Sequence, residues 1–322
     1  MSNHRKRLVE LFVKELSRGS FTDYLGIRQQ LFAPIVDPHS ISFSYKIPAH
    51  ICLPYKGRPC ITASATMALF DEYSSMCFMM KDKGARGGVS IMLTADVHQF
   101  CAAGTDVTIV TRATKVGKTI GFCDIEMFDH NKELVSRGSH VKFVDMGRMW
   151  DFAMHPSRIS TTLALYDALG ERLLNTAIGD NVMSLLGKGK RLSDLSPAFG
   201  EVGAAYREFG LSSEGADQRE GGGTQAHFKM KPHMGNYFGN LHGGAAAMLA
   251  EECSVRASAG ESQSRHINTI VVCSFTCKAD IRNATCFSSL SDLFAAGGRI
   301  TSMDMKYLTP MTVGRRGGPP CL

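Results

Sequence analysis

The stretch that decides the fold is Asn236-Tyr-Phe-Gly-Asn-Leu-His-Gly-Gly-Ala-Ala-Ala-Met-Leu-Ala-Glu-Glu252, which predicts a loop leading directly into a helix. The Ala, Met and Leu residues favour a helix, and the two glycines allow a ligand or another backbone to approach closely. No Ser, Thr or Asp side chain stands where it could cap the first N–H groups, those of Gly243 and Gly244. The start of this helix is therefore suited to developing negative charge.

A carboxylate further along the same helix suggests the other half of a reactive site. At about 1.5 Å per residue, Glu251 lies roughly 12 Å from Gly243 along the helix axis. The two groups therefore cannot serve one reacting atom. A second helix of the same kind, packed antiparallel to the first, would bring the start of each helix beside the acid of the other.

The sequence contains such a second copy. Leu69-Phe-Asp-Glu72 matches Leu249-Ala-Glu-Glu252, and the same spacing places Thr62-Ala-Ser64 opposite His242-Gly-Gly244. Similar extended segments precede both copies, around residues 43–48 and 228–232. We interpret this as an internal duplication of a unit much longer than a solenoid repeat.

Both halves resemble hotdog-fold domains of the PaaI-like acyl-CoA thioesterases. The C-terminal half carries that family's Asn-x5-His-Gly-Gly-x6-acidic pattern at Asn236, His242, Gly243, Gly244 and Glu251. In the N-terminal half the likeness extends over about residues 42–144. The resemblance implies an α+β fold with two hotdog units in one chain, each a long central helix wrapped by a curved antiparallel sheet.

The length of 322 residues also suggests two domains. We expect a first hotdog unit with an N-terminal helix over 1–148, a helical and linker junction over 149–226, and a second unit over 227–322. Residues 89–144 predict a meander of three or four strands, with turn residues such as Gly104 between them. The polar, Gly-rich residues 215–225 predict a mobile linker.

The second unit departs from the first. The comparable strand, 301–310, follows Glu251 after about 50 residues instead of 19, and residues 262–300 make up the excess. We expect these residues to form an insertion outside the hotdog core, and the last strands of the unit to be missing. Either this hotdog unit has an open, incomplete sheet, or the sequence contains a retained intron and a premature end. We favour the retained intron and premature end. A truncated polypeptide of this kind could be inactive.

Composition limits the partners and the compartment. The formal charge is +6 with scattered basic residues, which argues against nucleic acid, and no apolar run of 18 residues predicts a membrane span. The ten cysteines indicate reduced thiols of an intracellular protein. Cys273, Cys277 and Cys286 lack a fourth zinc ligand, so we expect neither metal nor cofactor. Glu10 and Glu15 favour a cytoplasmic packing helix over a mitochondrial address.

The resemblance also implies one complete catalytic site between the halves. The N–H of Gly243 would polarise the thioester oxygen, Asn236 and His242 would hold the reacting group, and Asp71 would activate water or attack, positioned by Ser90. Substrate-binding candidates are Gly244, Arg86 and Lys118.

The reciprocal site would pair Glu251 with Thr62 and Ala63, with Lys56 at the Asn position, and we expect it to be degenerate. The function implied is acyl-CoA hydrolysis. The internal pseudo-dimer could also assemble further into a homo-oligomer. The alternatives are a non-catalytic acyl-CoA-binding or structural hotdog protein and, less favoured, a hotdog hydratase. The sequence does not indicate the acyl chain.

Overall fold

The long helix α3 (Ala63–Lys81) forms the centre of the computed structural model, which describes residues 3–17, 19–170, 201–209, 216–218, 224–226, 232–236, 241–258, 273–280 and 299–307. Thr62 caps the helix by accepting a hydrogen bond from the N–H of Ala65 at 3.1 Å, and the extended backbone of Asp82 ends it. Nearly every side chain of α3 is buried, so the helix is enclosed on all sides and not merely on one face.

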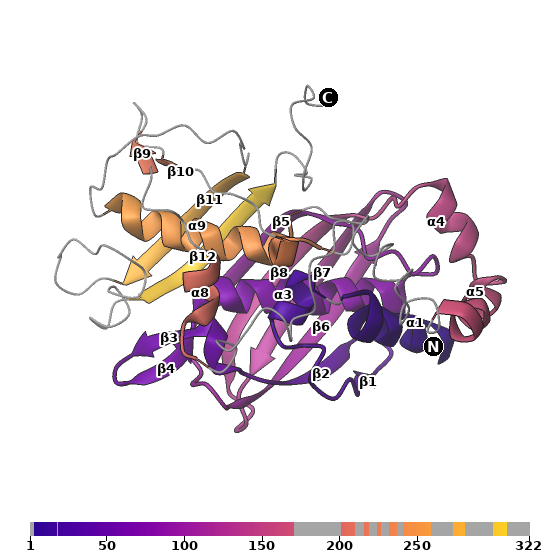
Figure 1. Cartoon of the computed structure of the whole chain (residues 1–322), viewed down its shortest axis with the longest axis horizontal. Coiled ribbons are helices and arrows are strands. Elements are labelled where there is room, and N and C mark those ends of the chain that lie inside the picture. Colours follow the sequence, from indigo (N-terminus) through magenta and orange to yellow (C-terminus); the bar gives the residue numbers. More distant parts are fainter. Residues whose placement is uncertain are drawn as a thin grey trace.

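An antiparallel sheet covers one side of α3, as Figure 1 shows. The strands lie in the order β1-β2-β6-β7-β8-β5-β12-β11. Their bounds are β1 Ile35–Val36, β2 Ile41–Lys46, β5 Val89–Val97, β6 Asp106–Val116, β7 Ile120–Phe128, β8 Leu134–Phe143, β11 Cys273–Asp280 and β12 Arg299–Tyr307. An antiparallel sheet with a helix packed on it is a hotdog-like fold, and β3 (Cys52–Tyr55) and β4 (Arg58–Ile61) form a separate hairpin before α3.

The predicted meander is correct for β6, β7 and β8 but wrong for β5. Strand β5 pairs with β8 and β12, whereas β6 pairs with β2 and β7. The connection between β5 and β6 turns away from β5, because the N–H of Ile61 binds the carbonyl of Cys101 at 2.9 Å and the N–H of Gly104 binds that of Ile47 at 2.7 Å. Gly104, with φ of 81°, therefore directs the chain beside β2 instead of closing a hairpin.

The second half of the chain extends the same sheet. Strand β12, at the position predicted for a counterpart of β5, lies antiparallel to β5, and β11 pairs with β12. The prediction that residues 262–300 stay outside the core is therefore wrong for residues 273–280 and 299–300, since ladder hydrogen bonds hold both stretches in the sheet. Residues 262–272, 281–298 and 308–322, which carry the rest of the insertion and the chain end, lie outside the described residues.

Helix α9 (Gly243–Ser258) packs beside α3 and contacts β11, so the two helices lie next to each other on the same face of the sheet (Figure 1). The start of α9 contacts Asp71 of α3, and the start of α3 contacts Glu251 of α9. Each acid is eight residues past the first residue of its own helix, so the two helices run antiparallel. A Cβ atom at Gly244 would stand 2.7 Å from the Cα of Ala68, and glycine thus permits this close approach.

The remaining elements surround this core. The N-terminal segment contains α1 (Asn3–Leu11), a π-helix (Phe12–Leu16) and α2 (Phe21–Tyr24), in agreement with the predicted N-terminal helix. Among the described residues, 3-10 turns are formed by Ala49–Ile51 and Pro232–Met234. The junction supplies α4 (Arg148–Ala153), α5 (Ile159–Leu165), a π-helix (Tyr166–Gly170) and α8 (Ala204–Phe209).

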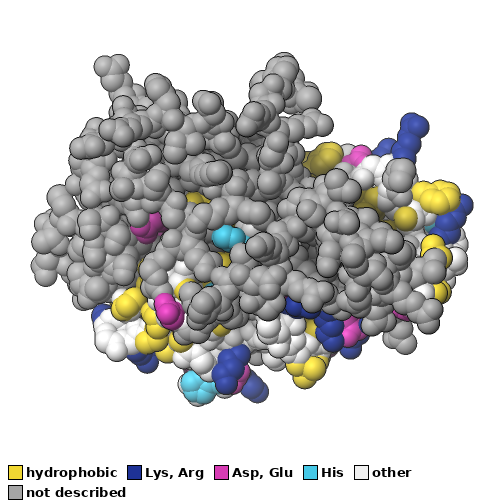
Figure 2. All heavy atoms as spheres, in the orientation of Figure 1, with side chains coloured by type: hydrophobic (Ala, Val, Ile, Leu, Met, Phe, Trp, Pro, Cys, Tyr) yellow, Lys and Arg dark blue, Asp and Glu magenta, His cyan; other side chains and the backbone are white. Residues whose placement is uncertain are grey.

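Part of the predicted linker is ordered into strands. β9 (Ala216–Gln218) and β10 (Thr224–Ala226) pair as a small hairpin that contacts α9, so the linker prediction is wrong for these residues. Within the described part of the chain, every helix is too short or too polar to cross a bilayer. On the face shown in Figure 2, the basic, acidic and hydrophobic side chains of the described residues lie intermixed.

We expect Gly244→Ala to destabilise the protein by about 1–3 kcal/mol, because the added methyl group overlaps the α3 backbone and the ring of Phe21. Equilibrium urea denaturation measures this loss. Gly57→Ala is the control: its Cβ would meet no atom within 4 Å, so its positive φ of 80° alone should cost about 1 kcal/mol. Unchanged stability of Gly244→Ala would contradict the close helix contact.

Candidate active site

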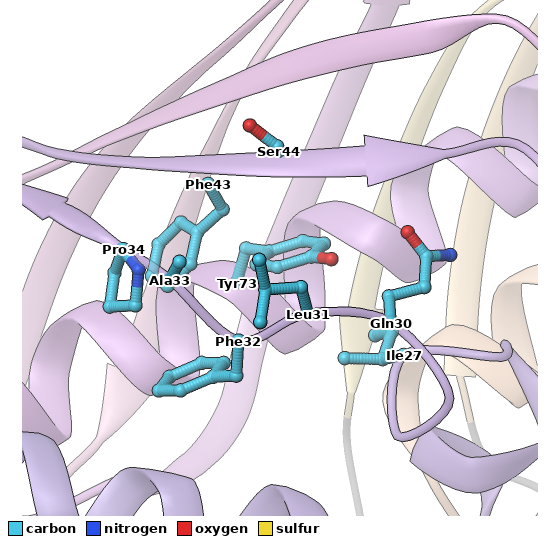
Figure 3. A pocket seen from close by; sticks show the side chains of 9 residues that line it. All are labelled: Ile27, Gln30, Leu31, Phe32, Ala33, Pro34, Phe43, Ser44 and Tyr73. Carbon is cyan, nitrogen blue, oxygen red and sulfur yellow. The ribbon is translucent and has the colours of Figure 1, made fainter.

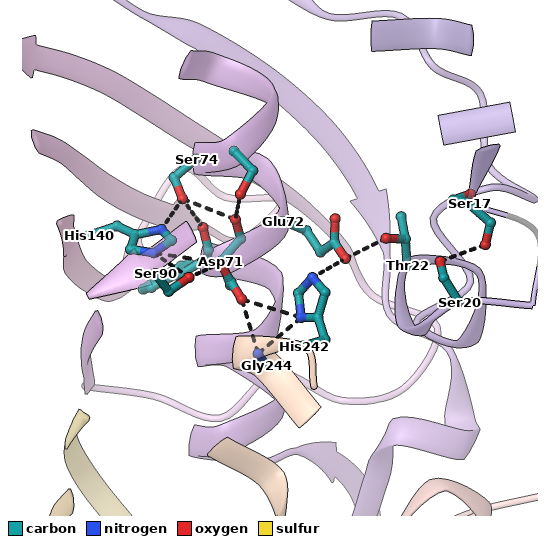
Figure 4. Close-up of polar contacts among 12 residues, drawn as sticks. Ser17, Ser20, Thr22, Asp71, Glu72, Ser74, Ser90, His140, His242 and Gly244 are labelled. Carbon is teal, nitrogen blue, oxygen red and sulfur yellow. Dashed lines mark hydrogen bonds and ion pairs between the residues drawn. The ribbon is translucent and has the colours of Figure 1, made fainter. Parts of the chain in front are cut away.

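Asp71 lies where the middle of α3 meets the start of α9 (Figure 4). Its Oδ2 accepts a hydrogen bond from the N–H of Gly244 at 3.0 Å, and its Oδ1 accepts one from the hydroxyl of Ser90 on β5 at 3.0 Å. The carboxylate is almost fully buried. The residue spacing in the sequence thus brings a carboxylate to the N-terminus of a helix, where the helix dipole favours negative charge.

Basic side chains surround the same carboxylate. His242 Nδ1 lies 3.2 Å from Oδ2, while Lys142 Nζ and His140 Nε2 each lie 3.6 Å from Oδ1. Burial alone would raise the pKa of Asp71, but His242, Lys142, His140 and the Ser90 hydrogen bond outweigh it and hold the pKa well below its usual range. Asp71 is therefore ionised throughout the physiological pH range.

His242 sits between two acids. Its Nε2 lies 2.8 Å from Oε1 of Glu72, which also accepts a hydrogen bond from the hydroxyl of Thr22 at 2.6 Å. Burial disfavours the charged imidazole, but the carboxylates of Glu72 and Asp71 outweigh this effect and raise the pKa of His242. The N–H of Gly244 also lies 3.0 Å from Nδ1.

His140 and Ser90 form a chain of hydrogen bonds that ends at Asp71. Ser74 Oγ lies 2.6 Å from Nδ1 of His140, and Nε2 lies 2.9 Å from Ser90 Oγ. Burial lowers the pKa of His140 to about 3, so the ring is neutral. With its one proton on Nε2, His140 donates to Ser90, and Ser90 in turn donates to Asp71.

Sequence reasoning missed Thr22, Glu72, His140 and Lys142. A signal existed for the last two, because they stand two residues apart on the buried face of β8, where polar side chains need partners. Glu72 directly follows Asp71 and carried no separate signal. Thr22 lies just after the N-terminal stretch that we interpreted as a packing helix, and it carried no signal of its own.

A second buried acid occupies the reciprocal position. Glu251 Oε2 accepts hydrogen bonds from the backbone N–H of Ser64 at 3.3 Å and from the hydroxyl of Ser64. Tyr206 of α8 bonds to the hydroxyls of Thr62 and Ser64, so its phenol covers the start of α3. Glu251 Oε1 has no hydrogen-bond partner within the described residues. Burial, only partly offset by these bonds, raises the pKa of Glu251 to about 7.

The other predicted site residues lie at the start of α9, in the loop before it, and at the end of the sheet near Gly117. Gly243 is the first residue of α9, and Asn236 follows Gly235, whose carbonyl accepts the N–H of Phe21 at 2.9 Å. Lys118 is exposed in the β6–β7 turn. Arg86 already binds both Asp82 oxygens, at 2.7 and 2.8 Å, and the carbonyls of Lys118 and Gly117. These bonds satisfy the guanidinium, so we do not include Arg86 in a ligand site.

A small, mostly apolar pocket lies between residues 27–34, β2 and α3 (Figure 3). It encloses about 250 Å³ including its open mouth, and the rings of Phe32, Phe43 and Tyr73 line it. Gln30 fixes this loop by exchanging two hydrogen bonds with the backbone of Lys46, at 2.9 and 2.7 Å. None of the predicted site residues lines the pocket, so we keep it apart from the site at Asp71. Among the described residues, no His, Cys, Asp and Glu side chains group as metal ligands do.

Comparison with known families agrees with this geometry. Residues 63–136 match the thioesterase superfamily, a range that contains α3, Asp71 and Ser90. The match supports a thioesterase-superfamily domain over this stretch, and the antiparallel sheet with α3 packed on it is hotdog-like. No curated protein sequence matches the chain.

Several solved structures are similar to part of the chain. Thioesterase superfamily member 2 from Mus musculus is 20% identical with a TM-score of 0.34, covering 45% of this chain and 99% of its own. The E. coli PaaI protein from the phenylacetic acid degradation operon is 17% identical with a TM-score of 0.29, covering 34% and 80%. A hypothetical thioesterase with coenzyme A from Streptococcus pneumoniae is 16% identical with a TM-score of 0.31, covering 35% and 84%.

The raised pKa of Glu251 predicts a pH-dependent stability difference. Between its ordinary pKa of 4.5 and the folded-state value of about 7, the folded protein binds a proton that the unfolded chain releases, so stability falls as pH rises through this window. Glu251→Gln removes this titration. Relative to the wild type, the variant should gain up to about 3 kcal/mol between pH ~4.5 and ~7.5.

Urea denaturation at several pH values measures this difference. Glu133→Gln, which changes an exposed acid, should keep the pH dependence of the wild type. A Glu251→Gln difference that stays constant across the window would show that Glu251 titrates normally.

Proposed function

We propose that the protein is an acyl-CoA thioesterase that hydrolyses an acyl-CoA to a free acid and CoA at one site between α3 and α9. The observation that carries the proposal is the ionised Asp71 held by the N–H of Gly244 and the hydroxyl of Ser90 at the start of α9. The thioesterase-superfamily match over residues 63–136 supports the reaction class.

The proposed reaction begins with water between Asp71 and the thioester carbon. Asp71 takes one proton from the water as its oxygen attacks the carbonyl carbon, and the carbonyl electron pair moves onto the oxygen. The N–H of Gly243 and the positive end of α9 stabilise this oxyanion, while Asn236 orients the carbonyl group. The electron pair on the oxyanion then re-forms the carbonyl bond, the C–S bond breaks, and the departing CoA thiolate takes the proton from Asp71.

The surroundings of Asp71 fit this role. A buried carboxylate without cations would be protonated near neutral pH, and a protonated acid cannot accept a proton from water. Lys142 and His242 keep Asp71 ionised, and its two oxygens retain lone pairs beyond those engaged by Gly244 and Ser90. The low pKa makes Asp71 a weaker base, but one that is always in its reactive form.

The reciprocal position lacks these features. Glu251 faces Ser64 in place of a glycine, its pKa is raised to about 7, and Tyr206 bonds to both hydroxyls at the start of α3. A pKa of about 7 leaves this carboxyl about half ionised at neutral pH, but Tyr206 bonds at the start of α3, where a water and a thioester would have to bind. We therefore propose that this half-site is catalytically silent.

The arrangement also supports two hotdog units in one chain as the origin of the site. Strands β12 and β5 lie antiparallel side by side, as do α9 and α3, which is the relation that two copies of one unit would have about a twofold axis. We propose that the internal pairing replaces a dimer of single units. We further propose that the internal pseudo-dimer assembles into a larger homo-oligomer and that the protein acts in the cytoplasm.

The two acids should respond differently to amide substitution. We expect Asp71→Asn to lower turnover by about 10²–10⁴-fold, because it removes the base, and Glu251→Gln to stay within about threefold of the wild type. A screen over short, long and aromatic acyl-CoAs with thiol detection first selects the substrate. Circular dichroism then confirms that both variants fold.

Three other outcomes are informative. Equal losses in both variants would show that both half-sites work. Reversed losses would overturn the assignment of the base. Binding of acyl-CoA without hydrolysis in the wild type would favour a binding protein.

A further inference from the structure

Three distant parts of the chain meet at His242. Thr22 and Phe21 come from α2, Glu72 from α3, and His242 itself directly precedes α9. The Phe21 ring packs on the imidazole with centroids 4.9 Å apart, and the N–H of Phe21 binds the carbonyl of Gly235 at 2.9 Å. The N-terminal segment therefore supports the imidazole directly as well as through Glu72.

The contact between Glu72 and His242 is buried and specific. Glu72 is 6% exposed and His242 is 8% exposed, so neither side chain is solvated. A buried carboxyl group is costly unless it is paired and hydrogen-bonded. Oε1 of Glu72 is paired with Nε2 of His242 at 2.8 Å. The same oxygen accepts a hydrogen bond from the hydroxyl of Thr22 at 2.6 Å.

The charges around His242 favour its protonated form. Helix α3 contributes the acids Glu72 and Asp71, and β8 contributes Lys142, together with the neutral His140. The residues that face the ring from α2, Phe21 and Thr22, are uncharged. Two acids in direct contact outweigh one lysine that lies closer to Asp71, and an aromatic face also favours a cation.

We propose that Glu72, itself held by Thr22, is a positioning residue that keeps His242 as an imidazolium, so that the site carries a fixed positive charge beside Asp71. This inference rests on the proposed hydrolysis for its catalytic consequence, but the protonation of His242 is independent of any substrate. In the imidazolium form both ring nitrogens donate to carboxylates, Nε2 to Glu72 and Nδ1 to Asp71, and the N–H of Gly244 donates to Asp71. His242 therefore acts through Asp71 and the local charge, without donating to the substrate.

The first test follows the protonation of His242 without substrate. Side-chain ¹H–¹⁵N NMR of histidine-labelled protein gives titration curves, and His242→Gln identifies the signal among the 11 histidines. Glu72→Gln should lower the midpoint of His242 by at least about one pH unit, because it removes the directly contacting carboxylate. An unchanged midpoint would overturn the proposal.

Matched variants separate this effect from general damage. Glu126→Gln removes a carboxylate from the more exposed pair with Arg112, at 2.6 Å, and should leave the midpoint unchanged. Thr22→Val removes only the hydroxyl that holds Glu72 and should lower the midpoint by a smaller amount. Glu72→Asp keeps the charge and should recover part of the shift. Because Thr22→Val is nearly isosteric, it remains informative if Glu72→Gln does not fold.

The second test uses the pH profile of kcat/KM for acyl-CoA hydrolysis. Loss of the imidazolium at high pH should set the alkaline limb, and Glu72→Gln should move that limb to lower pH. The variant should lose about tenfold or more at pH 8 and less than about threefold at pH 5. A loss that is equal at both pH values would indicate a purely structural role and would overturn the proposal.

The two tests distinguish the two claims. If the wild type hydrolyses no acyl-CoA but the His242 midpoint falls in Glu72→Gln, the proposed function fails and the Glu72–His242 pair stands. If hydrolysis occurs and neither the midpoint nor the alkaline limb moves, the pair has no such role.

Discussion

The structure depends on a reciprocal contact between two antiparallel helices, in which the start of each helix donates a backbone N–H to a buried acid of the other. Gly244 binds Asp71 at 3.0 Å, and Ser64 binds Glu251 at 3.3 Å. A buried acid needs hydrogen bonds, and the first turn of a helix has N–H groups without partners inside the helix. Each helix thus satisfies the other, and the approach is close enough that Gly244 leaves no room for a methyl group. The sheet formed by β5 and β12 spans the same junction and holds the helices in register.

Equivalent positions have nevertheless acquired opposite electrostatic surroundings. Asp71 faces His242 and Lys142, which lower its pKa, whereas Glu251 is surrounded by hydroxyl groups and has a pKa raised to about 7. The difference arises outside the helix pair, because His242 and Lys142 of β8 lower the pKa of Asp71, whereas at Glu251 burial outweighs the hydrogen bonds from Ser64 and Thr62. The account therefore assigns chemistry to one acid and a structural role to the other, although both have the same spacing from the start of their helix.

Much of the helix pairing could be predicted from the sequence, because spacing along a helix is a local property. The match of Leu69–Glu72 with Leu249–Glu252 was sufficient to place Asp71 near Gly244. The order of the strands could not be predicted, because a turn residue such as Gly104 marks where a strand ends but does not indicate which strand lies beside it. Strand β11 was assigned to an insertion because its residues belong to the stretch by which the second copy is longer than the first. Within the site, Glu72 and Thr22 were missed because tertiary contacts alone bring them to His242.

The most direct test of the central claim is a pH titration of the two acids in the folded protein by ¹³C NMR of their carboxyl carbons. The account predicts that the Asp71 carbon shows no titration between about pH 4 and 9, because nearby cations keep it ionised. The Glu251 carbon should titrate with a midpoint at about 7. If Asp71 takes up a proton above about pH 5, or if both carbons titrate together, the two acids share one environment and the division of roles between them is wrong.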